Sequence, residues 1–322
     1  MTRFTPSTSV RWWALIGMLI IALGVSACSS SNDDGDEAAA ITVTHAKGTI
    51  TLPAAPERIV AVGSGDVQIA SALGGEVVGA VANPSAPDKN WPGTPKPFRE
   101  SVMSLDSTTP NIEAIAALHP DVILATTAQQ AYIDKYPELS RIAPTVVYKT
   151  EAFADSGDTL VELIGTALGK PDQARDLISS SKQAISEFTE SNPTVKGMTY
   201  AFGQYAGDQL YLLASEKNPS TRFLTSLGMR LDPKVAELGK DGAQGGFTEL
   251  SAENYTQISS AQKVLVSTPG DEGGAKFSAI PTVKSAFGSQ LEVISTDLAG
   301  ALLTANPAST DYLLEQLRPA LA

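Results

Sequence analysis

The sequence predicts an α/β protein of two lobes, each with a mainly parallel sheet, joined by a long helix. Three observations support this prediction. Short apolar runs alternate with helical patterns from residue 41 onward, one helical region near the middle is much longer than the rest, and each half contains a helical pattern that leads into an apolar run. Strands that alternate with helices are typical of βαβ units and of a mainly parallel sheet.

The N-terminus has the features of an export signal. Arg3 and Arg11 precede an uncharged stretch at residues 12–25, which as a helix would span about 21 Å, less than the ~30 Å hydrocarbon core of a bilayer. Small residues then lead to Cys28, the single cysteine of the chain. This pattern resembles a bacterial lipobox, which implies that residues 1–27 are a lipoprotein signal peptide and that Cys28 is acylated. A plain secretory signal with a chance cysteine is the alternative.

Residues 28–40 are predicted to form an acidic, flexible tether. They are small, polar and acidic, and they offer almost no apolar surface to bury. A tether of this length would hold the folded part some ~20 Å from the membrane.

The first lobe is predicted over residues 41–157. Its apolar runs are short, and its helical patterns lie between them. The predicted strands are residues 49–52, 58–62, 77–81, 121–125 and 145–148, and the predicted helices are residues 66–73, 112–118 and 131–142.

Residues 158–191 are predicted to form the connecting helix. Apolar residues recur there at helical spacing from Leu160 to Phe188. The tripeptide Gly169-Lys170-Pro171 predicts one break, because proline fits the start of a helix and not its interior. Asn192-Pro193 is expected to end the helix.

The second lobe is predicted over residues 192–322, and part of it repeats the order of the first. Residues 110–124 and 248–266 both read as a glutamate-led helix followed by an apolar strand, with Glu113 and Glu253 at matching positions. Two similar lobes linked by a helix are typical of a protein that binds its ligand in a cleft. The predicted strands are residues 198–202, 210–214, 263–267 and 291–295, and the predicted helices are residues 221–227, 252–258, 283–287 and 310–317.

Composition excludes several classes of function. The 322 residues carry a formal charge of −12, which argues against binding nucleic acid, whose phosphates require a basic surface. One cysteine cannot form a disulfide within the chain, and two histidines, His45 and His119, leave few nitrogen ligands for a zinc site.

No motif for catalysis or for a resident cofactor is found. Gly63-Ser64-Gly65 follows a predicted strand, but Gln68 occupies the third glycine position of a dinucleotide-binding turn. Val62 likewise occupies the first glycine position of a nucleophile elbow. The expectation is therefore a protein that is not an enzyme, with no catalytic residue, no bound metal and no cofactor.

Several segments resemble the periplasmic-binding-protein family for iron-siderophores and vitamin B12. The resemblance covers essentially the whole chain after Cys28 and is more specific in the first half than in the second. It implies two Rossmann-like lobes held by a long rigid helix, and a monomer that docks on the permease of an ABC importer driven by its ATPase. The matching segments are His45-Ala46-Lys47-Gly48, Pro53, Pro56, Arg58-Ile59-Val60-Ala61, Pro110-Asn111-Ile112-Glu113, His119-Pro120-Asp121-Val122, Leu139-Ser140, Ile142-Ala143-Pro144-Thr145, Arg222-Phe223-Leu224 and Leu227-Gly228.

The resemblance implies a docking role for Glu113 and Glu253. In this family a glutamate from each lobe meets arginines of the permease, and such charge pairs chiefly set orientation and association rate. A structural role is the alternative, because each glutamate also lies near a predicted helix N-terminus, where the helix dipole stabilises a carboxylate by ~0.3–1 kcal/mol.

Five residues are candidates for ligand binding, because aromatic walls and a few fixed polar groups suit a chelate held between lobes. Core packing or surface placement would account for each of them equally well. Arg99 or Arg222 could pair with an anionic ferric chelate. Several siderophore binders of the family carry an arginine just before the Pro-Asn segment, whereas residues 106–109 contain none, which argues against hydroxamate recognition. The five candidates are Trp91, Arg99, Tyr148, Tyr205 and Arg222.

The sequence as a whole therefore predicts a lipid-anchored binding protein on the outer face of the cell membrane. Its expected ligand is a ferric siderophore, with the iron held by its chelator, that binds between the lobes and is passed to the permease. Cobalamin or haem is the alternative ligand within the same fold. A cell-wall lipoprotein hydrolase is the alternative outside it.

Overall fold

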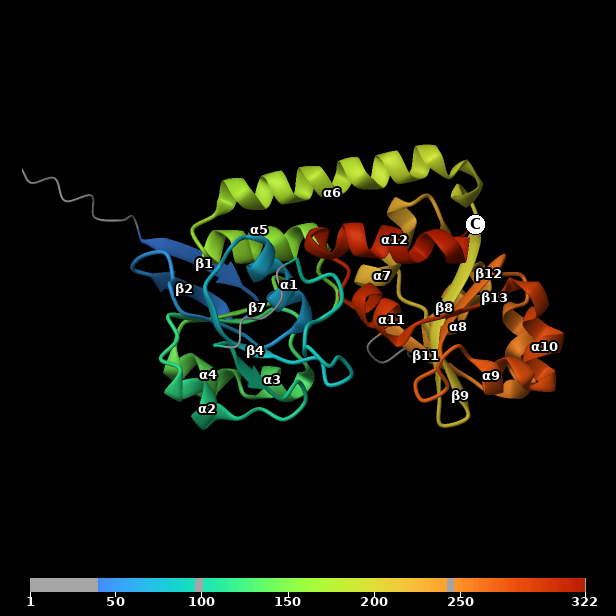
Figure 1. Cartoon of the computed structure of the whole chain (residues 1–322), viewed down its shortest axis with the longest axis horizontal. Coiled ribbons are helices and arrows are strands. Elements are labelled where there is room, and N and C mark those ends of the chain that lie inside the picture. The colour runs from blue at the N-terminus through green and yellow to red at the C-terminus, as the bar shows by residue number, and fades with distance from the viewer. Residues whose placement is uncertain (1–39, 96–100, 242–245, 322) are drawn as a thin grey trace, which may run out of the picture. The chain divides into compact units, whose positions relative to one another are not determined.

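The computed structural model describes residues 40–95, 101–241 and 246–321, which form two lobes, each with its own sheet (Figure 1). Within the described residues no helix is both long and apolar enough to cross a membrane. The predicted signal peptide, most of the predicted tether and Cys28 lie outside the described residues.

The first lobe contains a five-stranded, fully parallel sheet in the order β5-β4-β3-β6-β7. An antiparallel hairpin of β1 and β2 lies beside β7, where the Ala46 amide donates to the Tyr148 carbonyl at 3.0 Å. The strands are β1 (Ile41–His45), β2 (Gly48–Leu52), β3 (Ile59–Ala61), β4 (Val77–Val81), β5 (Met103–Leu105), β6 (Val122–Ala125) and β7 (Thr145–Val147). The helices are α1 (Ser64–Ala72), α2 (Ile112–Ala117), α3 (Gln130–Asp134), α4 (Tyr136–Ile142) and α5 (Gly157–Ala167).

The second lobe contains a mixed sheet in the order β11-β9-β8-β12-β13, with β10 paired to β8. β8, β10, β12 and β13 are parallel to one another, whereas β9 is antiparallel to both of its neighbours, β8 and β11. The strands are β8 (Thr199–Ala206), β9 (Gln209–Leu213), β10 (Arg230–Leu231), β11 (Phe247–Leu250), β12 (Lys263–Ser267) and β13 (Leu291–Ile294). The helices are α6 (Pro171–Ser191), α7 (Pro219–Ser226), α8 (Pro233–Leu238), α9 (Ala275–Ala279), α10 (Pro281–Phe287), α11 (Thr296–Leu303) and α12 (Thr310–Leu321), and the 3-10 helices are η1 (Pro193–Val195), η2 (Gly239–Asp241), η4 (Ala252–Ile258), η5 (Gly288–Gln290) and η6 (Pro307–Ser309).

The segment predicted as one long helix with a break forms two helices that pack on each other, α5 and α6. α5 ends before Gly169, whose φ of +68° suits glycine, and α6 begins at Pro171. Gly165 lets the two helices approach, because a Cβ there would lie 2.4 Å from the Cβ of Ala174.

α6 contributes to the cores of both lobes. Ala174 and Ile178 pack in a first-lobe cluster with α5, whereas Phe188 packs in a second-lobe cluster with α12. At 1.5 Å per residue, 21 residues span about 31 Å. Figure 1 shows α6 running along both lobes with α12 beside it. The prediction of two mainly parallel lobes joined by a long helix is confirmed, while the boundaries 41–157, 158–191 and 192–322 stay predictions.

Several elements differ from the sequence predictions, and β1, β5, β10, β11, α8 and α9 are among those that were not predicted. The helix predicted over residues 131–142 is interrupted at Lys135, because Pro137 in the first turn of α4 favours a new helix start there. α11 is not predicted at all, since its sequence TDLAGALL follows β13 without a loop. Ser295 alone marks the change, and its hydroxyl caps α11 by accepting from the Leu298 amide at 3.1 Å.

Candidate functional site

The carboxyl ends of the parallel strands define one edge of each sheet, and hollows are found there. Ligands of open α/β sheets bind at this edge, because the loops that follow the strands are free to diverge. Three hollows, which we refer to together as the interlobe site, are lined by segments that include the loops after β6 and β7, the ends of β8 and β12, and the segment that follows the antiparallel strand β9.

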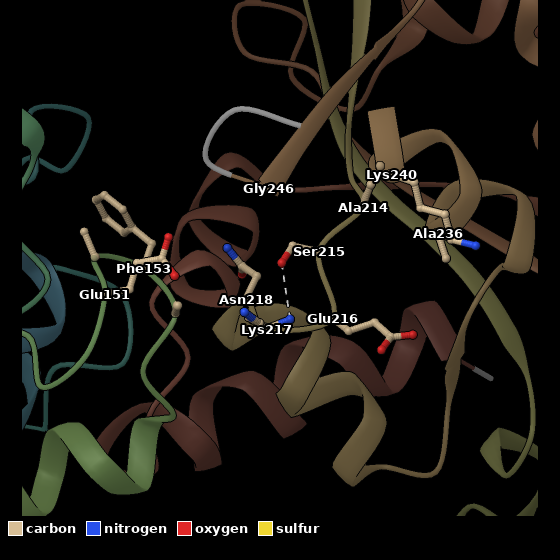
Figure 2. A pocket seen from close by; sticks show the side chains of 13 residues that line it. Glu151, Phe153, Ala214, Ser215, Glu216, Lys217, Asn218, Ala236, Lys240 and Gly246 are labelled. Carbon is tan, nitrogen blue, oxygen red and sulfur yellow. Dashed lines mark hydrogen bonds between the residues drawn. The ribbon is translucent and has the colours of Figure 1, made fainter. Parts of the chain in front are cut away.

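The largest of these three hollows, of about 550 Å³, lies between residues 151–154 of the first lobe and residues 214–218 of the second. Figure 2 shows Glu151 and Phe153 on one side of it and Ser215 and Asn218 on the other. Ala236 of α8, Gly239 and Lys240 of η2, and Gly246 complete its lining. Both lobes therefore contribute to one cavity.

Two smaller hollows share lining residues with the largest one or with each other. One, of about 10 Å³, shares Glu151 and Phe153 with the large hollow and adds Thr126, Thr127 and Tyr148. The other, of about 100 Å³, lies in the second lobe and shares Leu303 with the 10 Å³ hollow. Its remaining lining residues are Phe202, Gly203, Gln204, Phe247, Ser267, Thr296, Ala299 and Gly300.

Phe153 is held in the site by a loop that closes on a buried carboxylate. Asp155, 6% exposed, accepts hydrogen bonds from the amides of Lys149 and Thr150 and from the Thr150 hydroxyl. Phe153 has a φ of +60°, a left-handed conformation that is unfavourable for a bulky side chain. Such strain persists where surrounding bonds fix the backbone, and it concentrates at ligand sites.

The opposite wall, residues 215–218, is fixed to the start of α7. The Asn218 side chain caps this helix by accepting from the Ser220 amide at 2.9 Å, and the Ser220 hydroxyl donates to the Leu302 carbonyl at 2.8 Å. Asn218 is only 4% exposed. The Ser215 hydroxyl accepts from the Lys217 amide at 3.3 Å and can still donate its own proton to a ligand.

A second buried carboxylate, Asp66 of α1, fixes the loop that follows β6. It is completely buried and accepts hydrogen bonds from the Thr126 amide at 3.1 Å, from the Thr126 hydroxyl and from the Thr127 amide at 3.4 Å. Burial raises the pKa of Asp66 to about 6, although these hydrogen bonds act in the opposite direction. Thr126 and Thr127 both line the interlobe site.

The lobes are joined behind the site by buried side-chain amides. The Asn306 side-chain amide donates to Gln68 Oε1 at 2.7 Å, and Gln68 Nε2 donates to the Pro92 carbonyl at 2.6 Å. Asn306 follows α11 of the second lobe, whereas Gln68 belongs to α1 of the first. The Ser64 and Thr304 hydroxyls lie 3.4 Å apart in the same region.

The five predicted ligand-binding residues differ in where they lie relative to the hollows. Tyr148 lines the smallest hollow. Arg222 is exposed on α7 outside the hollows, but its Nε donates to the Lys217 carbonyl at 2.9 Å and so supports a residue that lines the large one. Arg99 lies outside the described residues.

Trp91 and Tyr205 do not line the hollows. The Trp91 ring packs against the first-lobe core, and its Nε1 donates to the Val81 carbonyl at 2.7 Å. The Tyr205 ring lies 4.5 Å from that of Phe277, and its hydroxyl bonds to Asp208. Their ligand-binding role stays a prediction.

Sequence reasoning did not select Phe153, Ser215 or Asn218. The available signals were weak: Asn218-Pro219 is typical of a helix start, and nothing in the local sequence marks Phe153.

Glu113 and Glu253 are both exposed at the N-terminal ends of short helices, α2 and η4. Each helix leads directly into a strand, β6 or β12, so each glutamate lies toward the carboxyl edge of its own sheet. Among the residues with described placement, no group of three or more His, Cys, Asp or Glu side chains could hold a metal ion.

Comparison with known proteins identifies the family. A family model described as "Periplasmic binding protein" matches residues 59–286. The chain belongs to this family. It is thus a binding protein, and it is not an enzyme.

Individual relatives agree with this assignment. The chain is 29% identical over 233 residues to the Bacillus subtilis "Probable siderophore-binding lipoprotein YfiY", covering 70% of this chain and 68% of that protein. It is 28% identical over 221 residues to the Escherichia coli "Fe(3+) dicitrate-binding periplasmic protein FecB", covering 67% and 69%. The crystal structure of Streptococcus pneumoniae PiaA in complex with ferrichrome superposes with a TM-score of 0.71 at 25% identity, covering 87% of this chain and 99% of that one.

The raised pKa of Asp66 predicts a pH dependence of stability. In the folded state Asp66 binds its proton more tightly than in the unfolded state, where its pKa is near 3.8. The resulting stabilisation is complete below that value and is lost as the pH rises through about 6. Relative to an Asp66→Asn variant, the wild type should therefore lose about 2 kcal/mol of unfolding free energy between pH 4 and pH 7.

Urea denaturation at a series of pH values measures this difference. Asp176→Asn on the exposed face of α6 is the control, and its curve should run parallel to that of the wild type. A difference between wild type and Asp66→Asn that stays constant across the pH range would contradict the prediction.

Proposed function

We propose that this protein captures a ferric siderophore in the interlobe site and delivers it to the permease of an ABC importer. The observation that carries the proposal is the 550 Å³ hollow lined by both lobes, in a periplasmic binding protein whose relatives include a probable siderophore-binding lipoprotein. Ligand sites of this kind have volumes of about 300–1,000 Å³ and combine apolar walls with a few placed polar groups.

The site is suited to binding without large rearrangement. Asp155 and Asp66 fix loops of the first lobe, Asn218 fixes the wall of the second, and α6 sets the distance between the lobes. A preformed site spends little free energy on ordering itself when the ligand arrives. Iron stays in its chelator throughout, so the protein contacts only the outer surface of the complex.

Phe153, Tyr148, Ser215 and Asn218 are the side chains that we assign to ligand contact. Phe153 and Tyr148 offer aromatic surface to the organic part of the chelate, and Ser215 and Asn218 offer hydrogen bonds. Arg222 acts behind them by holding Lys217 in place.

Ligand binding can be followed through Trp91, because the other two tryptophans, Trp12 and Trp13, lie in the predicted signal peptide. The protein purified in detergent should show quenched Trp91 fluorescence with at least one ferric siderophore. Phe153→Ala should weaken that binding about tenfold, since an aromatic contact contributes about 1–1.5 kcal/mol. Met103→Ala, at an exposed residue that begins β5, should leave binding unchanged.

The proposal fails if no ferric chelate binds. Cobalamin and haem belong in the same titration, and tight binding of either one alone would reassign the ligand while leaving the family unchanged. A thermal melt of Phe153→Ala distinguishes a lost contact from a misfolded protein.

We also propose that acylation of Cys28 anchors the protein to the membrane. A relative named as a lipoprotein supports this, together with the small residues before Cys28. Cells grown with radiolabelled palmitate should label the wild type and the Ser29→Ala control, and Cys28→Ala should lose the label completely. An unlabelled wild type would exclude the anchor.

Glu113 and Glu253 are proposed to dock on the permease. Reversing both charges, Glu113→Lys with Glu253→Lys, should slow siderophore uptake by whole cells about tenfold or more, because charge pairs steer association. Binding of the siderophore to the purified variant should not change. Glu162→Lys, exposed on α5, is the control. Normal uptake by the double variant would exclude the docking role.

A further inference from the structure

The charges around the interlobe site indicate which class of chelate it accepts. We propose that the ligand is a ferric chelate without net negative charge, such as a tris-hydroxamate, and not an anionic tris-catecholate or citrate complex. This inference rests on the proposed function and deepens it.

The described lining of the large hollow carries no net charge, because the carboxylates of Glu151 and Glu216 are balanced by the ammonium groups of Lys217 and Lys240. Asp155 is a third carboxylate but lines only the smallest hollow. The Asp155 carboxylate accepts hydrogen bonds from the Thr150 amide of its own loop. No arginine is among the described lining residues of the three hollows.

The two glutamates approach the large hollow from different lobes. Glu151 belongs to the first-lobe loop and Glu216 to the second-lobe wall, and both are exposed. Neither takes part in the ion pairs found among the described residues. An anionic ligand in this hollow would gain no net attraction from its charged lining, and the protein's formal charge of −12 would oppose its approach.

The charge of a ferric chelate follows from its donor groups. Iron(III) with three hydroxamates, each carrying one negative charge, is neutral, whereas three doubly charged catecholates leave a complex of charge −3. Ferric citrate complexes are also anionic. A neutral chelate needs no cationic cluster and is held by uncharged hydrogen-bond donors and apolar walls.

The uncharged lining fits such a ligand. Ser215, Asn218 and Gln204 offer hydroxyl and amide groups, and Phe153 and Phe247 offer apolar surface. Carbonyl and hydroxamate oxygens accept hydrogen bonds from groups of this kind. A neutral chelate needs no cationic partner, so the absence of an arginine from residues 106–109 does not exclude hydroxamates. The Asp106 carboxylate in this segment accepts hydrogen bonds from the Thr108 and Thr109 amides of its own loop.

The test is a titration of the detergent-purified protein with chelates that differ in charge. The probes are ferrioxamine B, which is cationic, ferrichrome, which is neutral, and the anionic complexes ferric enterobactin and ferric citrate. Cationic or neutral chelates should bind at least about tenfold more tightly than either anionic one. Tighter binding of an anionic chelate would overturn the inference and leave the proposed function intact.

Charge variants then test whether the glutamates cause the preference. Glu151→Gln and Glu216→Gln should each weaken ferrioxamine B binding about two- to fivefold and leave ferrichrome unchanged. Asp176→Asn on α6 is the matched control, with the same change of charge outside the hollows. Equal affinities of the glutamate variants and the control for ferrioxamine B would overturn the inference.

If Arg99 contacted the ligand, an anionic chelate would be favoured, because a guanidinium pairs with anionic groups. If an anionic chelate binds most tightly and Arg99→Gln abolishes that binding, the inference is wrong and Arg99 determines the ligand class. If no ferric chelate binds at all, the proposed function and this inference fail together.

Discussion

The hydrogen bond between Asn306 and Gln68 is the interaction on which the geometry of the ligand site depends. It joins the second lobe to the first and is continued by the bond from Gln68 to the Pro92 carbonyl. Both side chains are nearly inaccessible to solvent, at 4% and 1% exposed. Separating the lobes here would leave buried amides without partners, at a cost of about 1–3 kcal/mol per group. The bond therefore favours one arrangement of the lobes, and the walls of the site follow from it.

α6 supports the same arrangement from the other side. Because Ile178 packs in one core and Phe188 in the other, the lobes cannot separate along the helix without exposing apolar surface in at least one of them. The Ser181 hydroxyl also lies 2.7 Å from that of Thr310 at the start of α12, in a buried contact. A ligand site between lobes that are held at several points gains affinity from being preformed, which suits a chelate that is itself rigid once iron is bound.

The sequence predicts the fold better than it predicts the site, and the reason is physical. β6 is a fully apolar run and β12 has an apolar centre, and both lie beside helical patterns, so the pattern that predicts them is also the cause of their burial. The position of Phe153 depends instead on Asp155 closing a loop, and its closeness to Asn218 depends on how two distant segments meet. Trp91 looked suitable for a ligand because it is aromatic and lies in a loop, but its nitrogen is bound to the Val81 carbonyl and its ring packs on the core.

The loops after β6 and β7 are each fixed by a buried carboxylate, a group whose burial usually lowers the stability of a protein. Each loop leaves its strand with backbone amides that have no partner in the sheet, and a buried carboxylate accepts them: Asp66 after β6 and Asp155 after β7. The raised pKa of Asp66 shows that desolvation outweighs its hydrogen bonds, so this carboxylate destabilises the protein at neutral pH. What it contributes is a fixed position for Thr126 and Thr127 at the edge of the site. The buried Asp66 carboxylate thus lowers the stability of the folded protein at neutral pH while it fixes the loop at the edge of the sheet, where the shape of the site determines which ligand binds.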